Sequence, residues 1–154
     1  MDQKSDQLKE YVNEFLIRNP LSVTLTCRQR VNGEQLDEIS LSRNITHFLN
    51  RLNYRIYKKK FSRFGKKLGV ISVIEGDDRV RLHCHLTLEK PHHISHMKMC
   101  SLINHCWMKT KFGYLNFKVN SVIDEGWKSY QLKHRTKRDG LYSSVDWINT
   151  NSSV

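Results

Sequence analysis

The residues with the clearest chemical potential are His83 and His85, which flank Cys84 in a run of alternating side chains. In a β-strand, successive side chains point to opposite faces, so both imidazoles would project from one face and Cys84 from the other. Two neutral imidazoles on one side of a rigid strand supply half of a metal site. The simpler alternative is a half-buried strand with two solvent-facing histidines, and the motif by itself fits both.

A carboxylate that would complete the site is Glu75, which precedes the histidines across a Gly-Asp-Asp turn signal. The β-branched and apolar residues on both sides of this turn predict a hairpin. Glu75 shares a face with His83 only if the loop has an odd length or contains a bulge. A loop centred near Arg79 would place Glu75 opposite His83. We therefore predict that Glu75, His83 and His85 converge as a site of two imidazoles and one carboxylate.

A second group with chemical potential is Tyr130, in a segment predicted to be helical over about residues 121–137. Lys133 and His134 follow at helical spacing, so they are neighbours of Tyr130 on the helix surface. A tyrosine hydroxyl, with a pKa of about 10, is a poor nucleophile at neutral pH. A neighbouring cation stabilises the phenolate, and a metal ion on the electrophile lowers the demand on it. In isolation, Tyr130 is better explained as an ordinary residue of an amphipathic helix.

Cations and aromatic rings alternate through residues 51–67, and no acidic residue interrupts them. A charge run is usually a solvated face, but this density favours phosphate contacts from the cations and base stacking on the rings. The rings are Tyr54, Tyr57, Phe61 and Phe64. The cations that we expect to contact nucleic acid are Arg51, Arg55, Lys58, Lys59, Lys60, Arg63, Lys66 and Lys67, together with Lys128 and Lys137 of the later helix.

The elements that must position these groups follow from hydrophobic periodicity. Residues 21–27 alternate as a strand, and residues 41–52 place apolar side chains on one helical face behind a cap at Ser40 or Ser42. A further helix begins near Ser95.

With the hairpin, a strand over 114–119 and the helix that carries Tyr130, the order after an N-terminal helix is β-α-β-β-α-β-α. This order predicts an α+β, ferredoxin-like fold, in which helices cover one face of an antiparallel sheet. We divide the chain into an N-terminal helix packed on the domain (1–20), the main domain (21–138) and a C-terminal tail (139–154) that we expect to be loosely structured.

The composition and charge of the chain limit the classes of partner that we expect it to bind. The chain has 154 residues and a formal net charge of +11, which predicts one domain with an acidic partner, nucleic acid before an anionic membrane surface. The sequence shows no membrane-spanning run and no signal-peptide core, so we expect no membrane partner and a cytoplasmic location. The four cysteines show no CxxC spacing and are expected to be reduced and mostly buried.

Three motifs together resemble the HUH single-strand endonucleases, in particular the single-tyrosine Rep initiators of rolling-circle replication. Val23-Thr24-Leu25-Thr26 resembles their first-strand motif, His83-Cys84-His85 their HUH motif, and Tyr130-Gln131-Leu132-Lys133 their YxxK motif. The spacing from Glu75 to His83 also matches that of the third metal ligand in the family. The cysteine between the histidines is an unusual occupant of an apolar position.

The resemblance implies a metal-dependent nickase. Glu75, His83 and His85 would bind a divalent ion, Mg²⁺ or Mn²⁺ in the family, although the ligand types suit zinc as well. Tyr130 would attack a phosphodiester of single-stranded or origin hairpin DNA, leaving a 5′-phosphotyrosine and a free 3′-hydroxyl. Lys133 would assist the phenolate, with Lys137 as the alternative. Since the sequence shows no Gly-rich phosphate-binding motif, a host helicase is an expected partner.

Two other functions stay open at this stage. A single-tyrosine HUH transposase would use the same chemistry, and a noncatalytic ferredoxin-like module would bind RNA or DNA through aromatic residues on its central strands. Other residues could take the place of a predicted metal ligand or of the predicted nucleophile. They are His93 and His96 for the metal, and Tyr114 and Tyr142 for the nucleophile.

Overall fold

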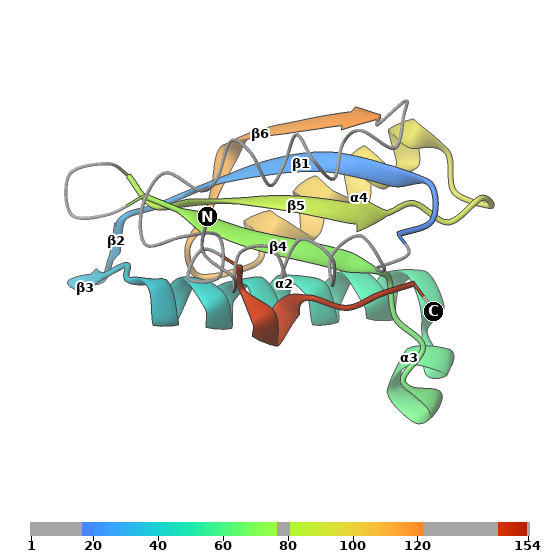
Figure 1. The fold of residues 1–154 in the computed structure, drawn as a ribbon. Helices are drawn as coiled ribbons and strands as arrows, with labels where there is room; N and C mark the ends of the chain where they lie inside the picture. Colours follow the sequence, from blue (N-terminus) through green and yellow to red (C-terminus); the bar gives the residue numbers. More distant parts are fainter. Residues whose placement is uncertain (1–16, 77–80, 122–144, 154) are drawn as a thin grey trace, which may run out of the picture.

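The computed structural model describes residues 17–76, 81–121 and 145–153 (Figure 1). Its centre is a four-stranded antiparallel sheet in the order β4-β5-β1-β6. The strands are β1 (Pro20–Cys27), β4 (Val70–Glu75), β5 (His83–Glu89) and β6 (Gly113–Ser121). Buried and partly exposed residues alternate along β1, whereas the first four residues of β4 are all buried. The strand order is that of a ferredoxin-like fold. The predicted α+β class is confirmed.

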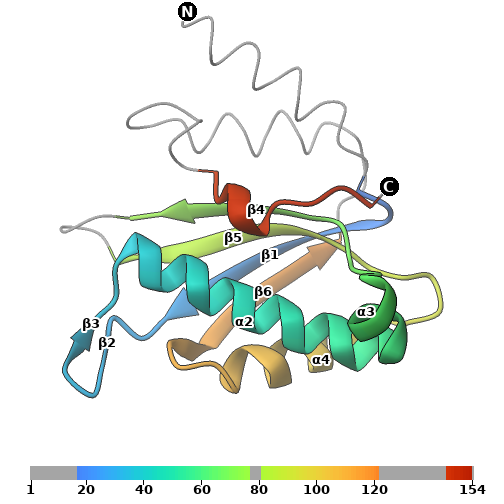
Figure 2. The same cartoon turned by 90° about the horizontal axis from the view of Figure 1, so that it is seen from below.

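Helices α2 (Glu38–Tyr57) and α4 (His96–Met108) cover one face of this sheet (Figure 2). The core lies between the two layers, where Phe48 and Trp107 meet edge to face with ring centroids 5.5 Å apart. Both side chains are fully buried, and each burial of this kind contributes roughly 1.5–3 kcal/mol or more. Trp107 also donates its indole N–H to the carbonyl of Thr26, which ties α4 to β1 at 2.9 Å.

The cap of α2 differs from the prediction. Asp37 is the N-cap, and Ser40 is the third helical residue, so neither Ser40 nor Ser42 caps the helix. The Asp37 carboxylate accepts from the Ser40 backbone N–H at 2.7 Å, while the Ser40 hydroxyl accepts from the Asp37 N–H at 2.9 Å. Hydrogen bonding to the carboxylate by the backbone N–H of Ser40, and then by its side chain, lowers the pKa of Asp37. The pair is a capping box with the usual residue types exchanged. At α4, Ser95 is the N-cap, as predicted.

The basic segment forms two helices rather than one. Lys58 adopts φ 52°, a conformation that non-glycine residues seldom take, and this turn separates α2 from α3 (Lys59–Phe64). Gly65 then ends α3 in the left-handed conformation that glycine tolerates best. All eight cations of the segment are exposed.

A short hairpin joins β1 to α2. Its strands are β2 (Arg30–Val31) and β3 (Glu34–Gln35). Asn32 and Gly33 both have positive φ, which a two-residue turn of this type requires.

The tail is ordered between residues 145 and 153. It contains the 3-10 helix η1 (Trp147–Asn149) and pairs with β4 at Val70 and Val73. Asp146 is buried there, and its carboxylate accepts from the hydroxyls of Ser42 and Ser72 at 2.8 and 2.9 Å. The expectation of a loosely structured tail is wrong for these residues. They show no hydrophobic periodicity that would have predicted a helix or strand, and their polar side chains instead form hydrogen bonds with α2 and β4.

Replacing Asp146 with alanine should lower the free energy of unfolding by on the order of 3 kcal/mol. The change would leave the buried hydroxyl of Ser72 without its charged acceptor, and losing such a bond costs roughly 1.5–3 kcal/mol. Urea unfolding followed by circular dichroism measures the effect. Asp146→Asn, which keeps one acceptor oxygen, should lose less than half as much, and equal losses in the two variants would contradict this account.

Several predicted elements lie outside the described residues. They are the N-terminal helix apart from residues 17 and 18, the helix over about 121–137 with Lys128 and Lys137, and Tyr142. In the described part of the chain, no helix is both long enough and apolar enough to cross a membrane. All four cysteines are free, and three of them are buried, as expected. Burial, opposed by the charge of Arg81, raises the pKa of Cys27 to about 12.

Candidate metal centre

The register of the sheet brings the three predicted ligands together. Glu75 on β4 is the direct cross-strand partner of His83 on β5, and His85 lies two residues further along the same strand. Because side chains alternate, all three project from the sheet face that α2 and α4 leave uncovered, whereas Cys84 is fully buried in the core. The predicted convergence of Glu75, His83 and His85 is confirmed, while their role as metal ligands stays a prediction.

The three side chains meet at one carboxylate oxygen. Oε2 of Glu75 lies 3.1 Å from Nε2 of His83 and 3.2 Å from Nε2 of His85. The two imidazole rings lie edge to face, with their centroids 4.9 Å apart. The side chains are 28 %, 25 % and 17 % exposed, respectively, so a phosphate group from solution can reach them.

The second nitrogen of each ring is also engaged. Nδ1 of His83 lies 3.0 Å from the carbonyl oxygen of Arg81, which can only accept, so the ring donates from Nδ1. Nδ1 of His85 is held by the hydroxyl of Thr24 on β1 at 3.0 Å. In a neutral His83 the lone pair of Nε2 then faces a carboxylate oxygen, which is a second acceptor. Two facing acceptors need a proton or a cation between them.

The donor set fits a divalent ion. Neighbouring ligand atoms at about 2.1 Å from an octahedral ion are about 3 Å apart, close to the two nitrogen–oxygen distances found here. Each histidine is oriented through its other nitrogen by a backbone or hydroxyl partner, as metal-bound histidines usually are. Two imidazoles and one carboxylate leave positions open for a substrate and water. Within the described residues, this is the only group of three such ligands.

The reserve ligands do not form a site of this kind. His93 and His96 lie before and at the start of α4, and the described part of the chain gathers no third ligand around them. His96 instead contacts Cys100 one turn further along the helix, with Nε2 and Sγ 3.5 Å apart.

The two residues assigned to nucleophilic chemistry, Tyr130 and Lys133, lie outside the described residues. The reserve nucleophile Tyr114 is described, on β6, and is 40 % exposed.

The basic segment lies away from the metal centre. The centre is at the start of β5, whereas α3 lies beyond the opposite end of the sheet (Figure 1). Six residues separate His83 from Glu89 at the end of β5, which corresponds to about 20 Å. A nucleic acid that contacted both would therefore extend along the sheet for about 20 Å.

A cation on the uncovered face was not predicted. Lys118 on β6 is the cross-strand partner of Thr24, the residue that orients His85, and it is exposed. The alternation of residues 114–119 assigns Lys118 to this face only if the pairing of β6 with β1 is known. That pairing cannot be deduced from the local sequence.

Comparison with known proteins gives one match. A family model described as a replication-associated protein of the ORF2 type matches residues 20–139, a range that includes all four strands of the sheet, both covering helices and the metal centre. No curated protein and no solved structure gives a significant match. Because the matched range covers most of the chain, the protein belongs to this family of replication-associated proteins.

Proposed function

We propose that the protein is a metal-dependent, site-specific single-stranded DNA nickase that initiates rolling-circle replication through a covalent tyrosine intermediate. The observation that carries the proposal is the convergence of Glu75, His83 and His85 on the sheet face opposite α2 and α4, in a chain from a replication-associated family. Such a centre is suited to a phosphate substrate, because its ligands are partly exposed and leave coordination positions open.

The proposed reaction exchanges one phosphodiester for another. A divalent ion held by the three ligands would polarise the scissile phosphate and offset charge on the leaving oxygen. The phenolate of Tyr130 forms a bond to phosphorus, and the bond from phosphorus to the 3′-oxygen breaks. The 3′-oxygen takes up a proton to become a hydroxyl, while the phenol proton passes to solvent or to a nearby base. Lys133 stabilises the phenolate as it forms, and rejoining needs no ATP because the phosphodiester energy is retained.

The polar character of the uncovered face supports catalysis over a noncatalytic binding module. The central strands β1 and β5 present Thr24, Thr26, His83 and His85 there, instead of the aromatic residues that a base-stacking sheet would use. The family match favours replication over transposition as the biological setting.

The test is an adduct assay with Mn²⁺ and single-stranded DNA labelled at its 3′ end, the end that stays linked to the protein after cleavage. Substrates are a pooled random library and candidate origin hairpins, and products are separated on a denaturing gel. The proposal predicts a DNA-linked protein band that forms with Mn²⁺ and is absent in EDTA. Tight DNA binding without an adduct in any divalent metal, on substrates that include the native origin, would instead support a binding module.

Removal of the Thr24 hydroxyl should weaken metal binding without removing a ligand. Thr24→Val releases Nδ1 of His85, and loss of such an orienting partner typically costs a factor of about 10 or more in metal affinity. Isothermal titration with Mn²⁺ measures the change. Ser22→Ala, two residues away on the same strand, is the matched control and should leave the affinity unchanged. A Thr24→Val affinity equal to that of the control would show that His85 needs no such support.

A further inference from the structure

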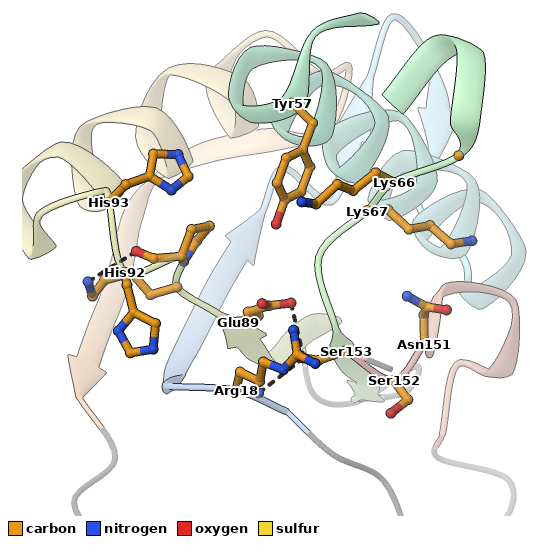
Figure 3. Close-up of a pocket in the computed structure, with 13 residues that line it drawn as sticks. Arg18, Tyr57, Lys66, Lys67, Glu89, His92, His93, Asn151, Ser152 and Ser153 are labelled. Atoms are coloured by element: carbon orange, nitrogen blue, oxygen red, sulfur yellow. Dashed lines mark hydrogen bonds between the residues drawn. The ribbon is translucent and has the colours of Figure 1, made fainter. Parts of the chain in front are cut away.

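A second site lies at the other end of β5. A cavity of about 510 Å³ opens there between the end of α2, the segment before β4 and residues 151–153 (Figure 3). A volume of this size accommodates a ligand of about the size of a single nucleotide. Glu75, His83 and His85 do not line it, so the cavity is separate from the candidate metal centre.

The rim of the cavity is cationic. Arg18, Lys66 and Lys67 line it and are exposed, and their side chains come from two segments far apart in the sequence. A fourth cation, Lys90, donates to the carbonyls of Pro91 and Ile94 at 3.4 and 2.6 Å, so it holds the following loop. The three exposed cations offer the donors that a phosphate group requires.

The floor of the cavity contains a buried acid. Glu89 is 8 % exposed, and its Oε1 accepts from the Gly69 N–H at 2.8 Å and from the Ser153 hydroxyl at 3.0 Å. Both of these bonds end on Oε1, so, among the bonds that the described residues make, Oε2 is the oxygen that can accept from a donor inside the cavity. A carboxylate at this position repels a phosphate but suits an N–H group of a ligand.

Tyr57 closes the side of the cavity between the rim and the floor. The ammonium of Lys66 lies 5.1 Å from the centre of its ring. Burial, and to a lesser extent the charge of Glu89, raise the pKa of Tyr57, while Arg18 opposes the rise. The phenol therefore stays a hydrogen-bond donor, and Figure 3 shows its hydroxyl directed toward the same space as Glu89.

We propose that this cavity binds one unpaired nucleotide, with its phosphate on Lys66, Lys67 and Arg18 and an amino group of its base on Glu89. Cytosine, adenine and guanine carry such an amino group, whereas thymine presents a carbonyl at the corresponding position. The inference rests on the proposed function, because it takes the nucleotide to be part of the DNA strand. This nucleotide would lie about 20 Å along the sheet from the cleaved phosphate. A free nucleotide has the same chemistry, and the test separates the two sources.

The experiment measures DNA binding by fluorescence anisotropy in EDTA, so that it does not depend on cleavage. Labelled dC and dT decamers are compared, and the dC decamer should bind about fivefold tighter or more. Lys66→Gln with Lys67→Gln should weaken both and reduce the slope of log affinity against log salt by about 1.4, since each phosphate contact contributes roughly 0.7 on single strands. The matched control is Lys98→Gln with Lys109→Gln, which removes two exposed charges from α4 and should change the slope by less.

A separate variant tests the proposed preference for cytosine over thymine. Glu89→Gln replaces an acceptor with a donor at one position, so the preference for dC over dT should disappear or reverse while the dT affinity is retained. Competition with free dCMP assigns the source: displacement at micromolar dCMP indicates a free nucleotide, and no displacement indicates a nucleotide within the strand. Equal affinities of the native protein for dC and dT, or equal effects of the two lysine pairs, would overturn the proposal. A failed adduct assay beside a positive binding result would count against the nickase alone.

Discussion

Tyr130→Phe should eliminate the covalent protein–DNA adduct, with a loss of at least about a thousandfold that reaches the detection limit. Phenylalanine keeps the ring but has no oxygen, so no phosphotyrosine bond can form. The measurement is the yield of DNA-linked protein after incubation with Mn²⁺ and the cleaved substrate. DNA binding in EDTA should change by less than about twofold, because the substitution removes no charge.

The control for this variant is Tyr114→Phe, which removes the hydroxyl of an exposed tyrosine on β6. It should leave the adduct yield at the native level. If the adduct survives in Tyr130→Phe and disappears in Tyr114→Phe, the nucleophile has been assigned to the wrong tyrosine. The fold and the metal centre would stand in that case, since neither depends on the identity of the nucleophile.

His85→Ala should lower the rate of adduct formation by about a hundredfold or more. The variant removes one of three ligands, and stabilisation of a phosphoryl transition state by a bound ion is worth several kcal/mol, with each 1.36 kcal/mol equal to a factor of ten. The second readout is direct Mn²⁺ binding, followed by the loss of the free-ion electron paramagnetic resonance signal. The variant should bind Mn²⁺ at least about tenfold more weakly.

His105→Ala is the matched control, because His105 is an exposed histidine on α4, on the covered side of the sheet. Its Mn²⁺ affinity and its adduct rate should equal those of the native protein. A His85→Ala protein that keeps both native values would remove the metal centre from the mechanism, whatever the nucleophile proves to be.

The metal centre was predictable because it depends on local periodicity and one parity rule. His83 and His85 share a face in any strand, and Glu75 joins them on that face if the loop between the strands has an odd length or contains a bulge. The structure pairs Glu75 with His83 directly. The sequence resemblance named the same three residues, so two independent lines led to one arrangement.

Other features were beyond local sequence for physical reasons. Asp37 was missed as a cap because its partner three residues on is a serine rather than a glutamate. The nucleotide cavity was missed because its walls come from residue 18, the end of α2, the end of β5 and residues 151–153, which only the tertiary fold assembles. Of the predicted cations, Lys66 and Lys67 line this cavity, whereas Arg51 and Arg55 lie on α2 and do not line it.

The tail that pairs with β4 has a consequence for behaviour in concentrated solution. Val70 exchanges two backbone hydrogen bonds with Asn151 at 2.6 and 2.7 Å, and the carbonyl of Ser72 accepts from the N–H of Asp146 at 2.8 Å. An edge strand with free backbone groups is a template onto which another chain can add, and this is a common start of aggregation. At Val70 and Ser72 of β4 those groups are already occupied by the protein's own residues. Any change that detaches residues 145–153 would therefore expose the edge of β4 to other copies of the chain, and we expect it to cause aggregation.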